Sequence, residues 1–166
     1  MAKITLEEWA RYRDMLAQIN QKAADEFRDY FFKGSTAKGL FDVTRDETVN
    51  LAYGLITKYG EASSALACQF YDEIAELEGI ILPTAEPADT VSIGYVNNAI
   101  DNTIKKFGDD VEKVSNLVNQ LTKKAGQDTM MKNAVRDKAE FAWVPAGVTC
   151  AFCLTLASNG WQTAKA

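Results

Sequence analysis

The spacing of apolar residues near the start of the chain constrains its fold more than any other feature. Apolar side chains recur at intervals of three and four residues: Trp9, Tyr12, Leu16, Ile19, Ala23, Phe27 and Tyr30. This spacing is typical of a coiled coil or of a long bundle helix. Thr5 and Glu8 place a capping-box sequence in front of it. The pattern predicts one helix over residues 5–33, roughly 40 Å long at the α-helical rise.

Helical patterns fill most of the remaining chain. Capping signals at Thr44 and Asp109, together with apolar residues at helical spacing, predict helices over residues 44–59, 61–77, 91–107, 109–125 and 129–141. Gly60 and Gly126 are interpreted as helix stops, the first within an antiparallel helical hairpin. The predicted fold class is all-α: an elongated helical bundle with a long N-terminal helix and a short C-terminal turn-helix that carries Cys-x-x-Cys.

One segment interrupts the predicted helices. Pro83 and Pro87 exclude a helix there. Residues 83–90 are therefore a linker between N-terminal helical hairpins, residues 1–82, and a C-terminal helical part, residues 91–166. The linker is either a hinge between two units or an ordered crossover within a single domain. We favour the crossover and expect one continuous domain, incomplete at its C-terminus, because neither half alone buries a large core.

Two cysteines near the C-terminus form the clearest chemical motif. Cys150 and Cys153 follow a turn at Pro145–Gly147 and open an apolar run. The pair fits half of a structural zinc site, a redox dithiol, a small disulfide or two packed core side chains. A structural zinc takes four ligands, whereas the chain has three cysteines and no histidine, and Cys68 falls on the apolar face of a predicted helix. The chain alone therefore offers a half-site, and we expect it to be metal-free in isolation.

The segment that holds these cysteines reads Phe141-Ala-Trp-Val-Pro-Ala-Gly, then Cys-Ala-Phe-Cys, then Leu-Ala-Ser-Asn-Gly160. It resembles the signature of MuF-like phage minor head proteins. In that family, an aromatic-Ala-Arg-Val-Pro-x-Gly segment precedes Cys-Ala-Phe-Cys, and a downstream His-x-x-Cys-x-Cys completes the cluster. Here Trp143 stands at the arginine position and the His/Cys half is lacking. The resemblance implies no cofactor in this chain, and zinc on Cys150 and Cys153 if the natural chain continues with His/Cys ligands.

The same resemblance implies a function. It predicts a structural protein of a tailed phage or prophage head, a minor capsid component associated with the portal, assembled in the bacterial host cytoplasm. Two alternatives stay open. The first is that the chain is the particle-targeting N-terminal module of a prophage-encoded MuF-type toxin. The second is that it is an unrelated cytosolic helical interaction protein.

Composition narrows the remaining classes of function. A net charge of −5 is atypical of a duplex-DNA-binding protein. No apolar run is long enough for a transmembrane helix, which needs about 18 residues or more, and the N-terminus lacks an apolar signal region. The chain has no histidine, no glycine-rich phosphate loop and no Gly-x-Ser-x-Gly. We therefore do not expect an enzyme.

The first predicted helix is unusually rich in aromatic side chains. Five of them are predicted to form a partner interface: Trp9, Tyr12, Phe27, Tyr30 and Phe31. Together they offer more large apolar surface than one helix seam needs, and exposed apolar patches mark interfaces. We expect part of this surface to contact the portal, another capsid protein or a second copy of the chain.

Overall fold

The computed structural model describes residues 5–33, 37–141 and 162–163. Within these ranges the chain is helical except for short connections and one pair of two-residue strands. The elements in chain order are α1 (Leu6–Phe32), η1 (Leu40–Asp42), α2 (Arg45–Leu77), α3 (Ile93–Phe107), α4 (Val111–Arg136), β1 (Glu140–Phe141) and β2 (Gln162–Thr163). The prediction of an all-α fold with a long N-terminal helix is confirmed.

The first two long helices begin where their capping sequences predict. The Thr5 hydroxyl accepts a hydrogen bond from the Glu8 amide at 3.1 Å, and the Glu8 carboxylate accepts one from the Thr5 amide at 2.7 Å. Thr44 and Glu47 make the same reciprocal pair at the start of α2. These bonds satisfy amides that have no partner inside the helix. Short-range chemistry is therefore sufficient to start α1 and α2.

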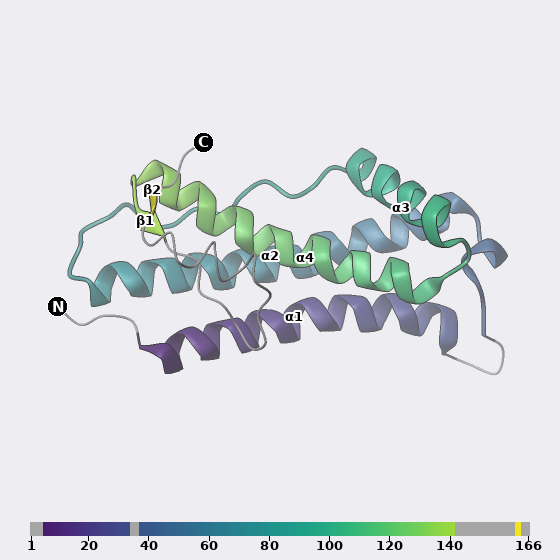
Figure 1. Ribbon diagram of the computed structural model, residues 1–166, viewed down its shortest axis with the longest axis horizontal. Helices are drawn as coiled ribbons and strands as arrows, with labels where there is room; N and C mark the ends of the chain where they lie inside the picture. The colour runs from purple at the N-terminus through teal and green to yellow at the C-terminus, as the bar shows by residue number, and fades with distance from the viewer. Residues whose placement is uncertain (1–4, 34–36, 142–161, 164–166) are drawn as a thin grey trace.

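Three long helices lie side by side along the length of the molecule. Figure 1 shows α1, α2 and α4 in this arrangement, with the shorter α3 near the end at which α1 stops and α2 begins. Each of α1, α2 and α4 packs against the other two, and α3 packs against α2 and α4. The molecule described is thus a three-helix bundle with a fourth helix added at one end.

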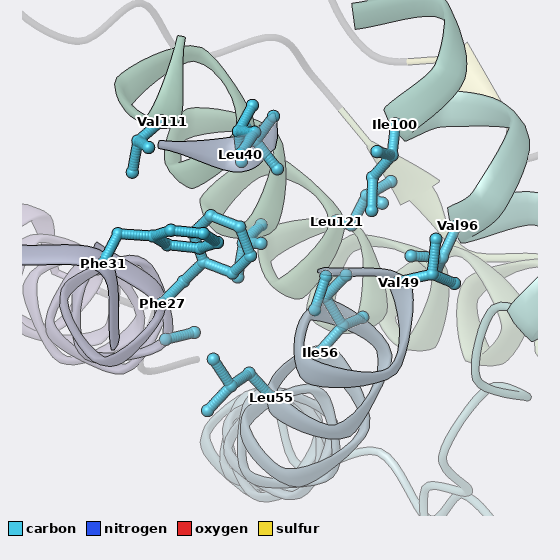
Figure 2. Packing of buried hydrophobic residues seen from close by; sticks show 14 residues of the cluster. Phe27, Phe31, Leu40, Val49, Leu55, Ile56, Val96, Ile100, Val111 and Leu121 are labelled. Atoms are coloured by element: carbon cyan, nitrogen blue, oxygen red, sulfur yellow. The ribbon is translucent and has the colours of Figure 1, made fainter. Parts of the chain in front are cut away.

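All four helices contribute to one hydrophobic core, shown in Figure 2. Phe27 and Phe31 are its largest fully buried side chains. The labelled residues around them are Leu40, Val49, Leu55, Ile56, Val96, Ile100, Val111 and Leu121. A smaller cluster of Tyr12, Leu16 and Phe70 lies between the N-terminal half of α1 and the C-terminal half of α2.

The predicted helix stops at Gly60 and Gly126 are wrong. Helix α2 continues for 33 residues through Gly60, and α4 continues for 26 residues through Gly126. A Cβ atom on Gly60 would lie 3.3 Å from the Cβ of Ala125, and one on Gly126 would lie 3.2 Å from Leu16 Cδ1. The glycines therefore allow the three long helices to approach closely, and the proposed hairpin at residues 59–60 does not form.

An extended connection joins α2 to α3. We call residues 79–92 the strap. Gly79 opens it with a φ of 67°, and the Ile80 amide donates to the Ala75 carbonyl at 2.9 Å to close the end of α2. Figure 1 shows that the strap runs back along α4 towards the start of α3.

A two-residue antiparallel ladder follows α4. Glu140 lies opposite Thr163, and Phe141 lies opposite Gln162. The predicted turn-helix that carries Cys150 and Cys153 lies outside the described residues.

Candidate functional site

Cysteine chemistry cannot be assigned to the described part of the chain. Cys150 and Cys153 lie outside it, and the residues it contains hold no cluster of three or more His, Cys, Asp or Glu side chains suited to a metal ion. Cys68 is half-buried on α2, and burial raises the pKa of its thiol. A raised pKa keeps the thiol protonated and unreactive, consistent with a packing role for Cys68.

Three of the five aromatic residues predicted to meet a partner pack inside this chain. Phe27 and Phe31 are fully buried, with ring centroids 5.2 Å apart. The Tyr12 ring stacks on Phe70 with a centroid separation of 4.1 Å, and burial raises the pKa of Tyr12 to about 12. These side chains belong to the intramolecular core because they face α2 and α4.

The other two aromatic residues keep the partner prediction open. The Trp9 ring lies 5.8 Å from the rings of both Tyr12 and Phe70, and its side chain is half-buried. Tyr30 is 43% exposed. The predicted partner surface on α1 therefore narrows to Trp9 and Tyr30, and it remains a prediction.

Four exposed aromatic side chains lie on elements that meet at one end of the molecule. We call the set the aromatic end: Tyr30, Phe32, Phe41 and Phe107. They come from α1, η1 and α3, whose relevant ends lie together in Figure 1. The Leu40 amide donates to Asp109 Oδ1 at 2.5 Å and so ties η1 to the turn between α3 and α4. Phe41, the next residue, is 65% exposed.

Lysine ammonium groups lie over two rings of the aromatic end. Lys38 Nζ is 5.6 Å from the Tyr30 ring centroid, whereas Lys106 Nζ and Lys113 Nζ are 5.2 and 4.7 Å from that of Phe107. Ammonium groups at such distances are attracted to the negative face of a ring. The resulting surface combines exposed aromatic rings with cations that lie over two of them.

Sequence reasoning missed Phe32, Phe41 and Phe107. Phe32 follows the buried Phe31 at the C-terminal end of α1 and is 46% exposed. Phe41 lies in a short connection, and Phe107 is the last residue of α3. The signal that could have found Phe32 and Phe41 is an aromatic residue at a helix end or loop, outside the repeating apolar spacing. Phe107 instead continues the spacing of Val96, Ile100 and Ile104, which predicts a core position, whereas it is 45% exposed.

A shallow groove runs along the seam between α1 and α2. A hollow of about 160 Å³ is lined by Tyr12, Met15, Leu66, Phe70 and Ile74, among others. Further along the seam, Tyr59 donates a hydrogen bond to Glu26, and that bond lowers the pKa of the Glu26 carboxyl. Lys58 Nζ lies 3.5 Å from the same carboxylate. The Glu26 carboxylate on α1 thus has two polar partners on α2.

No helix among the described residues combines the length and apolar character that a membrane crossing requires. No curated protein and no solved structure was found to match the chain. The family model described as "VG15 protein" matches residues 3–166, which includes the helical bundle, the aromatic end and the segment with Cys150 and Cys153. This protein belongs to the VG15 protein family.

Proposed function

We propose that this protein is a structural component of a tailed phage or prophage head, a minor capsid protein associated with the portal. The observation that carries the proposal is the resemblance of residues 141–160 to the MuF-like signature. The family match over residues 3–166 adds that the helical bundle and this segment occur together in one family. A structural role requires contact surfaces and does not require catalytic groups.

The aromatic end is the surface that best suits this role. Phe41 and Phe107 are 65% and 45% exposed, and they are held on elements that pack onto the common core. Aromatic side chains are enriched at the centres of protein interfaces, where they bury a large apolar area at a small cost in side-chain entropy. The apolar stems of the neighbouring lysines extend such a surface while their charges stay in water. We propose that this end contacts the portal or another capsid protein.

Mass spectrometry of purified particles from the encoding phage or prophage tests the proposal. The protein is expected in mature heads at a constant ratio to the portal protein. Detection only in the cell lysate, with none in purified heads, would contradict the assignment.

A variant pair tests which surface is used. Phe41→Ser combined with Phe107→Ser is expected to reduce incorporation into heads by about tenfold or more, as for loss of interface anchors. Ile81→Ser is the matched control, because Ile81 is fully exposed and follows α2, whose C-terminal end lies away from the aromatic end in Figure 1. Circular dichroism must show equal helix content in the unmodified protein, the double variant and the control. Equal incorporation of all three would exclude the aromatic end as the docking surface.

A further inference from the structure

The strap is held on the bundle by side chains that bind its backbone. Four of them lie on α4: Thr129, Lys132, Asn133 and Arg136. Asn133 accepts from the Glu86 amide at 2.9 Å and donates to the Glu86 carbonyl at 2.8 Å. The Ala88 amide donates to Thr129 Oγ1 at 3.0 Å. Because these four residues follow the spacing i, i+3, i+4 and i+7, they present one face of α4 to the strap.

Two more contacts extend the same attachment. Arg136 donates to the carbonyls of Pro83 and Thr84 at 2.8 and 2.9 Å. The Ala85 amide donates to Asp72 Oδ1, on α2, at 2.9 Å. Each contact engages a main-chain group of the strap, so a short extended stretch is fixed at nearly every residue.

Apolar burial contributes little to this attachment. Within residues 83–88 Ala85 alone is buried, and both prolines are exposed. A hydrogen bond that exchanges with water on opening contributes only modestly to stability. A segment with few buried apolar contacts and many polar ones opens at a lower free energy than the core. The strap is therefore held mainly by polar contacts, whereas the helices are held mainly by apolar contacts.

Arg136 connects the strap to the end of α4. Its guanidinium also donates to Asp137 at 2.8 Å, and the Tyr71 hydroxyl, on α2, donates to the same carboxylate at 3.0 Å. Arg136 is the last residue of α4, and β1 begins at Glu140. The Arg136 side chain that binds the strap thus also binds Asp137, the first residue of the short connection between α4 and β1.

We infer that the strap is a latch: residues 83–88 release from α4 as a unit while α1, α2 and α4 stay packed, and release loosens the last turn of α4. The position of residues 137–141 relative to the bundle then depends on whether the strap is bound to α4. The inference is independent of the proposed function, since it rests on the contacts of the strap alone.

Residue-resolved amide hydrogen exchange on the full chain tests the latch without any substitution. The amides of Ala85, Glu86 and Ala88 are expected to exchange through an opening that hardly depends on added denaturant. Buried amides of α1 are expected to exchange at higher free energy with a strong denaturant dependence, because they require global unfolding. If the strap amides and the α1 amides exchange through openings of the same free energy and the same denaturant dependence, the strap unfolds together with the core. The latch is then refuted.

Two variants test the coupling. Arg136→Met and Thr129→Val each remove contacts to the strap, and Lys123→Met is the control because Lys123 is an exposed lysine on the same helix. Strap amides are expected to exchange at least about fivefold faster in both variants than in the control, with α1 unchanged. Amides 137–139 are expected to follow in both. If amides 137–139 exchange faster in Arg136→Met but not in Thr129→Val, the strap and the end of α4 are not coupled. If the strap amides exchange at the control rate in both variants, the latch is refuted.

Discussion

Single residues determine how α2 and α4 end. At α2, Gly79 takes a φ of 67°, and at α4 Lys138 takes a φ of 52°. Both ends close with the same backbone bond, from the Ile80 amide to the Ala75 carbonyl at 2.9 Å and from the Ala139 amide to the Ala134 carbonyl at 2.8 Å. Glycine adopts this left-handed conformation freely, whereas a residue with a side chain does so at a cost.

Lys138→Gly is therefore expected to stabilise the protein by about 0.5–1 kcal/mol, since relief of the left-handed strain exceeds the extra freedom that glycine has in the unfolded chain. The reciprocal change Gly79→Lys is expected to destabilise it by about 1 kcal/mol. Urea unfolding followed by circular dichroism gives both free energies. A decrease in the unfolding free energy for Lys138→Gly would show that the Lys138 side chain makes a compensating contact.

The Asp137 carboxylate makes the free energy of unfolding depend on pH. Hydrogen bonds from Arg136 first, and from Tyr71, hold the pKa of Asp137 below its usual value. A depressed folded-state pKa contributes stability that is present above the unfolded pKa, about 3.9, and is lost as the pH falls through the folded value. Asp137→Asn is thus expected to lower the unfolding free energy at pH 7, by an amount that shrinks below about pH 4.

Unfolding titrations at pH 7 and pH 3 measure this loss for Asp137→Asn. Asp14→Asn is the control, because Asp14 is exposed on α1, and it is expected to change the free energy little. An Asp137→Asn deficit that is equal at both pH values would contradict the assignment of the stabilisation to the carboxylate charge.

At the scale of elements, α2 and α4 are long helices that cross at small residues. Ser64 Oγ donates to the Ala125 carbonyl at 3.2 Å, and Ser63 Oγ, fully buried, donates to Asn20 Oδ1 at 3.0 Å. Gly60 and Gly126 lie at the same crossing. Small side chains bring the helix backbones together, and their hydroxyls find partners within the structure, so the close approach leaves these polar groups satisfied.

A matched pair of glycine substitutions tests the crossing. Gly126→Leu is expected to destabilise the protein by about 2 kcal/mol or more, because the added side chain meets Leu16 and Ser63. Gly54→Leu is expected to stabilise it by up to about 1 kcal/mol, because Gly54 is exposed within α2 with no atom near its Cβ position and leucine favours helix. Thermal unfolding of both variants gives the comparison, and equal shifts would mean that the crossing is not tightly packed.

At the scale of the whole molecule, one core joins elements that are far apart in sequence. Phe27 and Phe31 of α1 pack in a cluster with Val49 of α2, Ile100 of α3 and Val118 of α4. The exposed aromatic residues lie outside this core. A single shared core makes unfolding of the described helices cooperative.

Phe27 and Tyr30 lie three positions apart on α1, one in the core and the other on the surface, so their substitution by alanine compares the two environments. Phe27→Ala is expected to lower the unfolding free energy by about 3–5 kcal/mol in one cooperative transition. Tyr30→Ala is expected to change it by less than about 1 kcal/mol, since Tyr30 is 43% exposed. Chemical denaturation measures both, and a large cost for Tyr30→Ala would remove Tyr30 from the candidate partner surface.

The sequence by itself determined the features that depend on neighbouring residues. A threonine oxygen that caps an amide three positions ahead acts within one turn, so the starts of α1 and α2 followed from Thr5 and Thr44. The periodic spacing of apolar residues identified α1 as a helix and the fold as all-α. Tertiary structure decided what depends on a distant partner. Gly60 continues a helix because Ala125 lies against it, and Phe27 is core whereas Tyr30 is exposed because α2 and α4 cover one face of α1. The polar contacts that hold the strap likewise join residues about 13 to 53 positions apart, a separation over which spacing rules carry no information.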